Sequence, residues 1–336
     1  MNDGEAPVTF LLDRGEDPWV IYWQGEFYYC HEHDDSTILV NRSRTLHGIS
    51  DNPVIVWMNG GPARELWAPE LHRIDGCWYI YYAEGPGENH RMHVLQGQGP
   101  DPQSTYLYRG RMNTGDSFAI DGTPFEWRGR WYFVWSGSDK GHNTQKLFID
   151  RMENPWLLAG NPVCISAPTF DWERCGMPTW PDINEAPQAL RHPTAERMFI
   201  VYSASHSVTD DYCLGRLDLA GPDPMSPGAW RKHPYPVFSK YVDDHIYGPG
   251  HASFVDTPDG GSWIIYHCSP VSGGGWDSRQ LRAQPFYWHT DGTPDFGYPG
   301  QIRAQTAHRV APTAPVPRKL QILPSEGSGT EPAEVH

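Results

Sequence analysis

The segment "DGTPFEWRGRWYFVWSG", residues 121–137, carries the pattern that decides the fold. It begins with an acidic residue, continues into a short aromatic strand, turns at a glycine and ends in a second run of aromatic and β-branched residues. Apolar runs of five to eight residues that are bounded by Gly and Pro are typical of β-strands and not of helices. We therefore predict a hairpin here, with Asp121 at the head of its first strand.

The same pattern occurs four more times along the chain, with heads about 50 to 66 residues apart. The other copies are "DPWVIYWQGEFYYCHE" from Asp17, "WAPELHRIDGCWYIYYAEG" from Trp67, "EAPQALRHPTAERMFIVYSAS" from Glu185 and "HASFVDTPDGGSWIIYHCSP" from His251. Segments between the copies, such as "TILVNRS" and "YCLGRLDL", supply outer strands. A strand repeat of this length indicates a β-propeller, in which four-stranded blades surround a channel. The sequence predicts an all-β, five-bladed propeller over residues 1–300.

The composition agrees with many short strands joined by turns. The 336 residues include 34 Gly, 32 Pro and 15 Trp, and the formal net charge is −15. This acidic balance, without a long basic run, argues against a nucleic-acid partner. No apolar run approaches the roughly 18 residues of a membrane helix. Residues 301–336 are rich in Pro, Ala and Ser, and we expect them to form a C-terminal extension that is flexible in its last part.

The chain start and the cysteines bear on location. The opening "MNDGEAPVTFLL" lacks the basic region and apolar block of a signal peptide, which predicts a cytoplasmic protein, or a secreted one if a leader has been removed. Six cysteines form no CxxC pair, so we expect buried free thiols and no disulfide framework.

Three acids head predicted innermost strands. Because such strands converge on one mouth of a propeller channel, Asp17, Asp121 and Glu185 should share a funnel. Carboxyl groups gathered in a partly desolvated site raise one another's pKa, so that one stays protonated while another is ionised. Glycoside hydrolysis needs this division between acid and base. We expect Glu70 to be structural and Asp291, in the second "DGTP", to be a turn residue.

The ordered blocks resemble glycoside hydrolase family 43 over roughly residues 10–300. They are "EDPWVIYWQGEFYY", "WAPELHRIDGCWYIYY", "AIDGTPFEWRGRWYFVW", "NEAPQALRHPTAERMFIVYSAS", "GPGHASFV" and "RAQPFYWHTDGTPDFG". The resemblance implies an inverting glycosidase on a five-bladed propeller that needs no cofactor. It implies that Asp17 is the general base, that Glu185 is the general acid and that Asp121 tunes the pKa of the acid and orients it.

Four further residues are predicted to bind substrate. Trp67 and Trp180 lie near blade heads, where an indole can stack on a sugar. The resemblance implies that His251 lies near the channel axis, where some family members bind a metal ion, which leaves open a structural calcium or other ion in the channel. It also implies that Arg282 of "RAQ" contacts the sugar. For the "CHEHDD" run from Cys30, an exposed strand end is favoured over a zinc site.

The sequence-based hypothesis is release of terminal α-L-arabinofuranosyl residues, with inversion, from oligosaccharides derived from arabinan or arabinoxylan. β-Xylosidase and endo-arabinanase activity remain alternatives within the family. A non-catalytic carbohydrate-binding propeller and a scaffold for protein partners remain alternatives of other classes. The predicted partner is an oligosaccharide, with no nucleic acid and no membrane.

Overall fold

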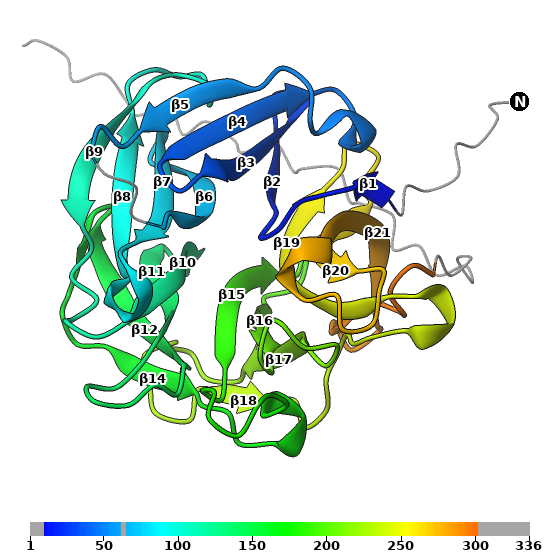
Figure 1. The fold of residues 1–336 in the computed structure, drawn as a ribbon. Helices are drawn as coiled ribbons and strands as arrows, with labels where there is room; N and C mark the ends of the chain where they lie inside the picture. The colour runs from blue at the N-terminus through cyan, green and yellow to red at the C-terminus, as the bar shows by residue number, and fades with distance from the viewer. Residues whose placement is uncertain (1–9, 62–64, 302–336) are drawn as a thin grey trace, which may run out of the picture. The chain divides into compact units, whose positions relative to one another are not determined.

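The computed structural model describes residues 10–61 and 65–301, which lie within one compact unit that ends at Arg303. Figure 1 shows five antiparallel sheets arranged around a common axis. This arrangement confirms the predicted five-bladed β-propeller. The predicted C-terminal extension lies outside the described residues, apart from Gln301.

Each blade is an antiparallel sheet whose first strand lies nearest the axis. Blades 1 and 2 comprise β2 (Trp19–Trp23), β3 (Glu26–Asp34), β4 (Thr37–Ser43) and β5 (Val54–Met58), followed by β6 (Trp67–Ile74), β7 (Cys77–Glu84), β8 (Arg91–Gly97) and β9 (Tyr106–Arg111). Blade 3 comprises β10 (Ala119–Trp127), β11 (Arg130–Gly137) and β12 (Lys146–Asn154), with β13 (Leu157–Leu158) and β14 (Val163–Ser166) both paired to β12.

Blades 4 and 5 complete the ring. They comprise β15 (Asn184–Arg191), β16 (Met198–Ala204), β17 (Cys213–Leu219) and β18 (Trp230–Lys232), followed by β19 (Tyr247–Asp256), β20 (Ser262–Ser269), β21 (Gln280–Trp288) and β22 (Pro294–Asp295). The N-terminal strand β1 (Phe10–Leu12) pairs with β21, so the two ends of the propeller meet in blade 5. Helical structure in the described part consists of single 3₁₀ turns: η1 (Leu46–Gly48), η2 (Gly87–Asn89), η3 (Asp171–Glu173), η4 (Val242–Asp244) and η5 (Trp276–Ser278).

The hydrophobic core lies between the blades. Tyr81 of blade 2 packs with Phe133 of blade 3, and Val134 of blade 3 belongs to one cluster with Tyr202 of blade 4. Because a blade is covered on both faces, its middle strand is apolar without alternation, and every residue of β16 is buried. The continuous aromatic runs of the sequence therefore mark middle strands.

A strained residue recurs at the head of every innermost strand. Five non-glycine residues there have positive φ angles of 42° to 54°: Asp17, Ala68, Asp121, Ala186 and His251. In blades 2 to 5 the strand pairing shifts register at this point, which marks a β-bulge. Left-handed backbone is costly for residues with a Cβ, and such strain clusters at functional sites.

The bulges correct one detail of the predicted repeat. Asp17, Asp121 and His251 occupy equivalent positions, whereas Glu185 precedes Ala186 and so lies one residue before that position. The Asp-Gly pair at residues 121–122 lies within β10 and does not form a turn. A Cβ on Gly122 would lie only 2.3 Å from Cζ of Phe133. The glycine permits close packing beneath the strained aspartate.

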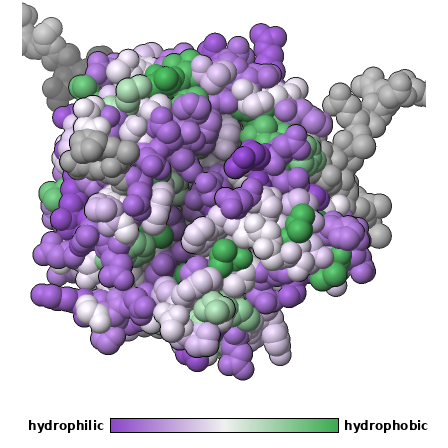
Figure 2. Space-filling view, in the orientation of Figure 1, coloured by the Kyte–Doolittle hydropathy of each residue, from purple (hydrophilic) through white to green (hydrophobic). Residues whose placement is uncertain are grey.

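The cysteines and the surface complete the description of the fold. All six cysteines are free, as predicted, and Cys30, Cys213 and Cys268 are buried. The expectation of burial is wrong for Cys77 and Cys164, which are exposed. Hydrophilic residues cover most of the face seen in Figure 2. In the described part of the chain, no helix has the length and apolar character needed to span a membrane.

Candidate active site

Asp17 lies at the centre of a group of nitrogen atoms at the channel mouth. Its Oδ1 is 3.0 Å from Nδ1 of His251, 3.3 Å from Nδ1 of His267 and 3.7 Å from Nη1 of Arg279. Burial raises the pKa of Asp17, but the charges of His251 and Arg279 outweigh burial and hold it well below its usual range. The carboxyl group is therefore ionised at neutral pH.

His251 and His267 contribute to this site in different ways. Burial lowers the pKa of His251, but the carboxylates of Asp17 and Asp121 outweigh it and raise the pKa to about 10. Burial and the charge of Arg279 lower the pKa of His267 to about 3. The neutral His267 ring accepts the backbone N–H of Asp17 at 3.2 Å, which supports the strained backbone there.

The proposed acid lies in a different environment in the same mouth. Glu185 is only 8% exposed and accepts a hydrogen bond from the Tyr212 hydroxyl at 2.8 Å. Burial and the nearby charge of Asp121 raise its pKa to about 8. Asp121 is itself 4% exposed, accepts the Ala186 N–H at 2.9 Å, and has a pKa raised to about 6 by burial and by Asp17. The structure thus brings the three predicted acids together.

Tyr212 contacts both Glu185 and His267, the histidine beside Asp17. Its ring stacks on His267 with centroids 5.7 Å apart, while its hydroxyl donates to Glu185. The same ring fills the space beside Gly250, where a Cβ would lie 2.2 Å from Cε1 of Tyr212. The glycine before His251 therefore allows Tyr212 to reach the acid.

Arg279 is the arginine that lies beside Asp17. Its guanidinium donates to Glu16 at 2.9 Å and to the carbonyl of Ser207 at 3.2 Å, next to Asp17. Arg282 instead lies on β21, where Nη2 contacts Gln280 at 3.4 Å, and it makes no ion pair within 4.0 Å among residues 10–61 and 65–301. Both arginines belong to "RQLRAQ", and contact of Arg282 with a sugar stays a prediction.

The two predicted aromatic contacts are exposed at the blade heads. Trp67 is 36% exposed and stacks on His90 with centroids 3.5 Å apart. Trp180 is 40% exposed and lies 4.1 Å from the ring of His206. Contact with a sugar stays a prediction for both residues.

Two polar side chains, Glu70 of blade 2 and Gln188 of blade 4, form a hydrogen bond across the channel. Glu70 is 2% exposed and accepts hydrogen bonds from Gln188 of blade 4 and from His72, the latter at 2.8 Å. Gln188 follows its strained head residue by two positions, as Glu70 does in blade 2. This pairing across the channel supports the structural role that we expected for Glu70.

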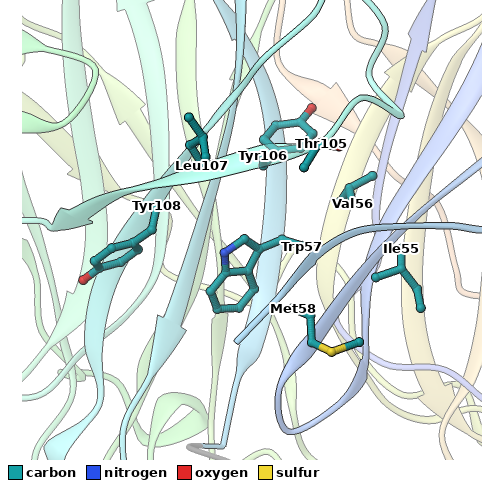
Figure 3. A pocket seen from close by; sticks show the side chains of 8 residues that line it. All are labelled: Ile55, Val56, Trp57, Met58, Thr105, Tyr106, Leu107 and Tyr108. Carbon is teal, nitrogen blue, oxygen red and sulfur yellow. The ribbon is translucent and has the colours of Figure 1, made fainter. Parts of the chain in front are cut away.

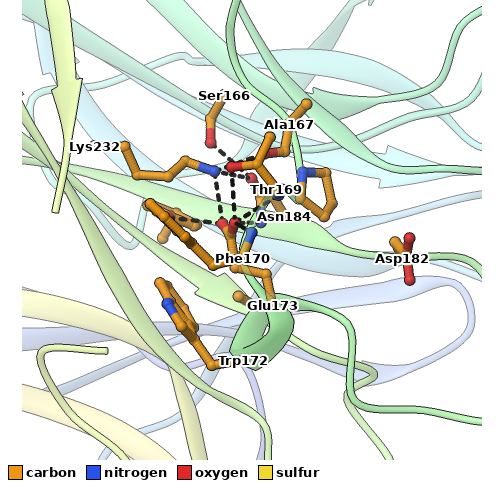
Figure 4. Close-up of polar contacts among 12 residues, drawn as sticks. Ser166, Ala167, Thr169, Phe170, Trp172, Glu173, Asp182, Asn184 and Lys232 are labelled. Atoms are coloured by element: carbon orange, nitrogen blue, oxygen red, sulfur yellow. Dashed lines mark hydrogen bonds and ion pairs between the residues drawn. The ribbon is translucent and has the colours of Figure 1, made fainter. Parts of the chain in front are cut away.

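A buried ionic network holds the strand that carries Glu185 (Figure 4). Glu173, which is 0% exposed, accepts from Lys232 at 2.6 Å, from Tyr202 at 2.9 Å and from Asn184 at 2.9 Å. It also accepts the backbone N–H groups of residues 169 and 170. Because Asn184 directly precedes Glu185, the network fixes the backbone from which the acid projects. No sequence motif predicted it.

The remaining sequence signals have local explanations. In "CHEHDD", His31 bonds the Glu32 carbonyl and the Asn41 side chain through its two ring nitrogens. Asp291 caps a turn by accepting the N–H and hydroxyl of Thr293. Within the described ranges, no group of three or more His, Cys, Asp or Glu side chains has a metal-binding arrangement.

A separate apolar groove lies on the outer strands β5 and β9 (Figure 3). Its volume is about 370 Å³, and its lining residues are Ile55, Val56, Trp57, Met58, Thr105, Tyr106, Leu107 and Tyr108. This groove contains no acidic side chain, so it is unsuited to the acid and base chemistry that the mouth can perform.

A carboxyl group with a lowered pKa and one with a raised pKa at the same channel mouth are the acid and base pair that glycoside hydrolysis uses. The family model "Glycosyl hydrolases family 43" matches residues 8–294, and the chain belongs to this family. It is therefore a glycosidase, and the resemblance found in the sequence is confirmed.

Individual relatives agree with this assignment. The chain is 33% identical over 342 residues to "Alpha-L-arabinofuranosidase 43" of Humicola insolens, covering 96% of this chain and 67% of that protein. It is 35% identical over 317 residues to an "Extracellular exo-alpha-(1->5)-L-arabinofuranosidase" of Streptomyces avermitilis, covering 87% and 64%. The chain thus spans about two thirds of the length of these relatives. The crystal structure of an α-L-arabinofuranosidase from Lactobacillus brevis is 32% identical, with a TM-score of 0.79, covering 88% of this chain and 97% of that one.

Proposed function

We propose that the protein is an inverting α-L-arabinofuranosidase that releases terminal arabinofuranosyl residues from arabinan- or arabinoxylan-derived oligosaccharides. The observation that carries the proposal is the opposite protonation of Asp17 and Glu185 in one mouth. The names of the similar proteins support the sugar, and the exo-acting Streptomyces relative supports attack at a chain end.

The reaction is a single displacement. Asp17, as the ionised base, takes a proton from a water molecule while the water oxygen forms a bond to the anomeric carbon. The bond between that carbon and the glycosidic oxygen breaks on the opposite side, and Glu185 gives its proton to the departing oxygen. One water is consumed, the anomeric configuration inverts, and the two carboxyl groups exchange protons with solvent before the next cycle.

The neighbouring groups set these protonation states. The carboxylate of Asp121 raises the pKa of Glu185, so that the acid retains its proton until the leaving oxygen needs it. His251 and Arg279 stabilise the charge of Asp17. The reaction needs no cofactor, because both proton transfers use side chains of this chain. His251 is the residue that the resemblance offers for a channel ion, and its Nδ1 faces Asp17 at 3.0 Å.

The substrate-binding roles belong to the same proposal. Trp67 and Trp180 supply exposed indole faces beside the mouth, and aromatic rings commonly line sugar-sized sites. Arg282 keeps the sugar contact that the resemblance implies, and Arg279 is added to this set because it reaches Asp17.

The cellular location is also a proposal. Six free thiols, two of them exposed, suit a reducing compartment, and we therefore favour uptake of oligosaccharides followed by cytoplasmic cleavage. The Streptomyces relative is named extracellular. Activity measured in washed cells against culture medium decides between the two.

The test is turnover of 4-nitrophenyl α-L-arabinofuranoside and 4-nitrophenyl β-D-xyloside side by side, with Asp17→Asn as control, because 4-nitrophenolate departs without a proton from Glu185 but water attack still needs the base. We expect arabinoside turnover that the variant loses, and NMR should show β-L-arabinofuranose as the first product. Faster xyloside turnover would favour a β-xylosidase. Binding without turnover of either glycoside or of arabino-oligosaccharides would favour a non-catalytic carbohydrate-binding propeller.

A further inference from the structure

Three aromatic rings lie side by side on loops of blades 4 and 5. The ring centroids of Trp180 and His206 are 4.1 Å apart, and those of His206 and Trp276 are 6.3 Å apart. Trp180 is 40% exposed and Trp276 is 54% exposed. We call Trp180, His206 and Trp276 the mouth platform.

Strand register places the mouth platform at the level of the acid. Glu185 pairs with Ser203 and Asn184 pairs with Ala204, the last residue of β16, so His206 follows the end of β16 beside the start of β15. Trp180 precedes β15, the strand that carries Glu185. Trp276 follows β20, whose His267 pairs with Gly250 next to the strained His251. All three rings therefore belong to the mouth end of the blades.

Hydrogen bonds anchor the Trp276 indole and the backbone of His206, although the indole rings are exposed. The Trp276 indole donates to the Ser207 hydroxyl at 3.0 Å, and the Ser207 carbonyl accepts from Arg279, which reaches Asp17. The backbone of His206 donates to the Cys175 carbonyl at 2.8 Å. Exposed indoles that are fixed in place offer flat apolar faces at little ordering cost.

We infer that the mouth platform binds the leaving-group chain, as the site for the sugars that follow the terminal arabinose. The inference rests on the proposed function, and it adds a preference for chain length. Glu185 protonates the departing oxygen, so the departing chain starts next to β15, and the platform lies at the same end of β15 and β16. Two indoles separated by a third ring can contact more than one sugar, and none of the three side chains is acidic, which suits a neutral chain.

The test compares kcat/KM for α-1,5-arabinotriose with kcat/KM for α-1,5-arabinobiose, which differ by one leaving-group sugar. In the wild type we expect a triose-to-biose ratio of about three to ten, the range that one aromatic contact provides. In Trp276→Leu this ratio falls toward one, while turnover of the biose changes less than about twofold. Trp276→Phe, which keeps a ring but loses the bond to Ser207, retains most of the ratio.

A matched control is Trp156→Leu. Trp156 is 36% exposed and contacts Arg109 on the outer part of the ring, so its loss leaves the ratio unchanged. Trp180→Leu gives a second platform variant if Trp276→Leu does not fold. An arabinoxylo-oligosaccharide, used in place of the arabinotriose, shows whether the platform binds a xylan chain or an arabinan chain.

The outcomes separate the two proposals. A wild type that cleaves arabinosides but shows equal kcat/KM for biose and triose overturns the platform and leaves the proposed function standing. An equal loss on both substrates in Trp276→Leu also overturns it, because the ring then acts only through Ser207 and Arg279. A wild type inactive on every arabinoside overturns the proposed function and the platform with it.

Discussion

Two buried glutamates, Glu173 on η3 and Glu185 on β15, lie twelve positions apart and have pKa values shifted in opposite directions. Glu173 is 0% exposed, and although burial raises its pKa, Lys232 and the N–H groups of residues 169 and 170 outweigh burial and lower it. Glu185 is 8% exposed, has the Tyr212 hydroxyl as a donor and lies near the charge of Asp121, and its pKa rises to about 8. Burial alone therefore does not set the protonation of a carboxyl group. The number of hydrogen-bond donors and the charges beside it decide the direction of the pKa shift.

The largest expected effect is on catalysis at Glu185. Glu185→Gln keeps the shape and an acceptor for Tyr212 but has no proton to give, so we expect kcat on arabino-oligosaccharides to fall by about 10² to 10⁴-fold. Asp17→Asn should cause a loss of similar size. Circular dichroism checks that both variants remain folded. A kcat within threefold of the wild type in either variant would contradict its assignment.

Breaking the network at Glu173 should affect stability more than chemistry. Glu173→Gln leaves Lys232 buried beside a neutral partner, and we expect the free energy of unfolding in urea to fall by about 3 kcal/mol. Lys232→Met should destabilise to a similar extent, and the double variant should recover part of the loss. If the double variant equals the sum of the single ones, the two side chains do not act as a pair.

Asp150 provides a control for this comparison. It is 1% exposed and accepts the backbone N–H groups of Gly160 and Asn161 at 2.7 and 2.9 Å, in an outer part of blade 3. Asp150→Asn should also destabilise, but without changing the pH dependence of kcat. A shifted pH profile in Glu173→Gln alone would then show that the network positions Glu185 through Asn184.

The pH profile tests the charges around Glu185. The acid must be protonated, so kcat/KM should fall as pH rises through about 8. Because the pKa of Asp17 is well below its usual range, kcat/KM should stay high as the pH falls. Asp121→Asn removes a negative charge and should move the basic limb to lower pH by about one unit. A basic limb that stays in place would show that burial, and not Asp121, raises the pKa of the acid.

The smallest expected effect is on the pH dependence of stability. Between the unfolded pKa near 4.5 and the folded pKa of about 8, native Glu185 holds a proton that the unfolded chain has lost, so stability falls as pH rises through this range. Glu185→Gln removes this cost, and its melting temperature should exceed that of the wild type by a few degrees at pH 8 but not at pH 4. Glu173→Gln should behave oppositely, with its largest deficit above pH 5.

Much of the fold and part of the site could be predicted from the sequence. The repeated turn and aromatic strand gave the number of blades, and the acids at their heads identified Asp17, Asp121 and Glu185 as neighbours. Arg279 and His267 were missed because His267 lies on the second strand of blade 5 and Arg279 directly before the third, where the repeat carries no distinctive signal. The one-residue offset of Glu185 was invisible because a bulge leaves the hydrophobic pattern of the strand intact.

The sequence by itself determined the blade count, the strand order and the acids that the channel mouth collects, because alternating turns and apolar runs depend only on neighbouring residues. The tertiary structure decided which acid holds a proton. That outcome depends on Lys232 reaching Glu173 from β18, on Tyr212 reaching Glu185 and on Arg279 reaching Asp17. Charges act through space, and these partners come from distant parts of the chain.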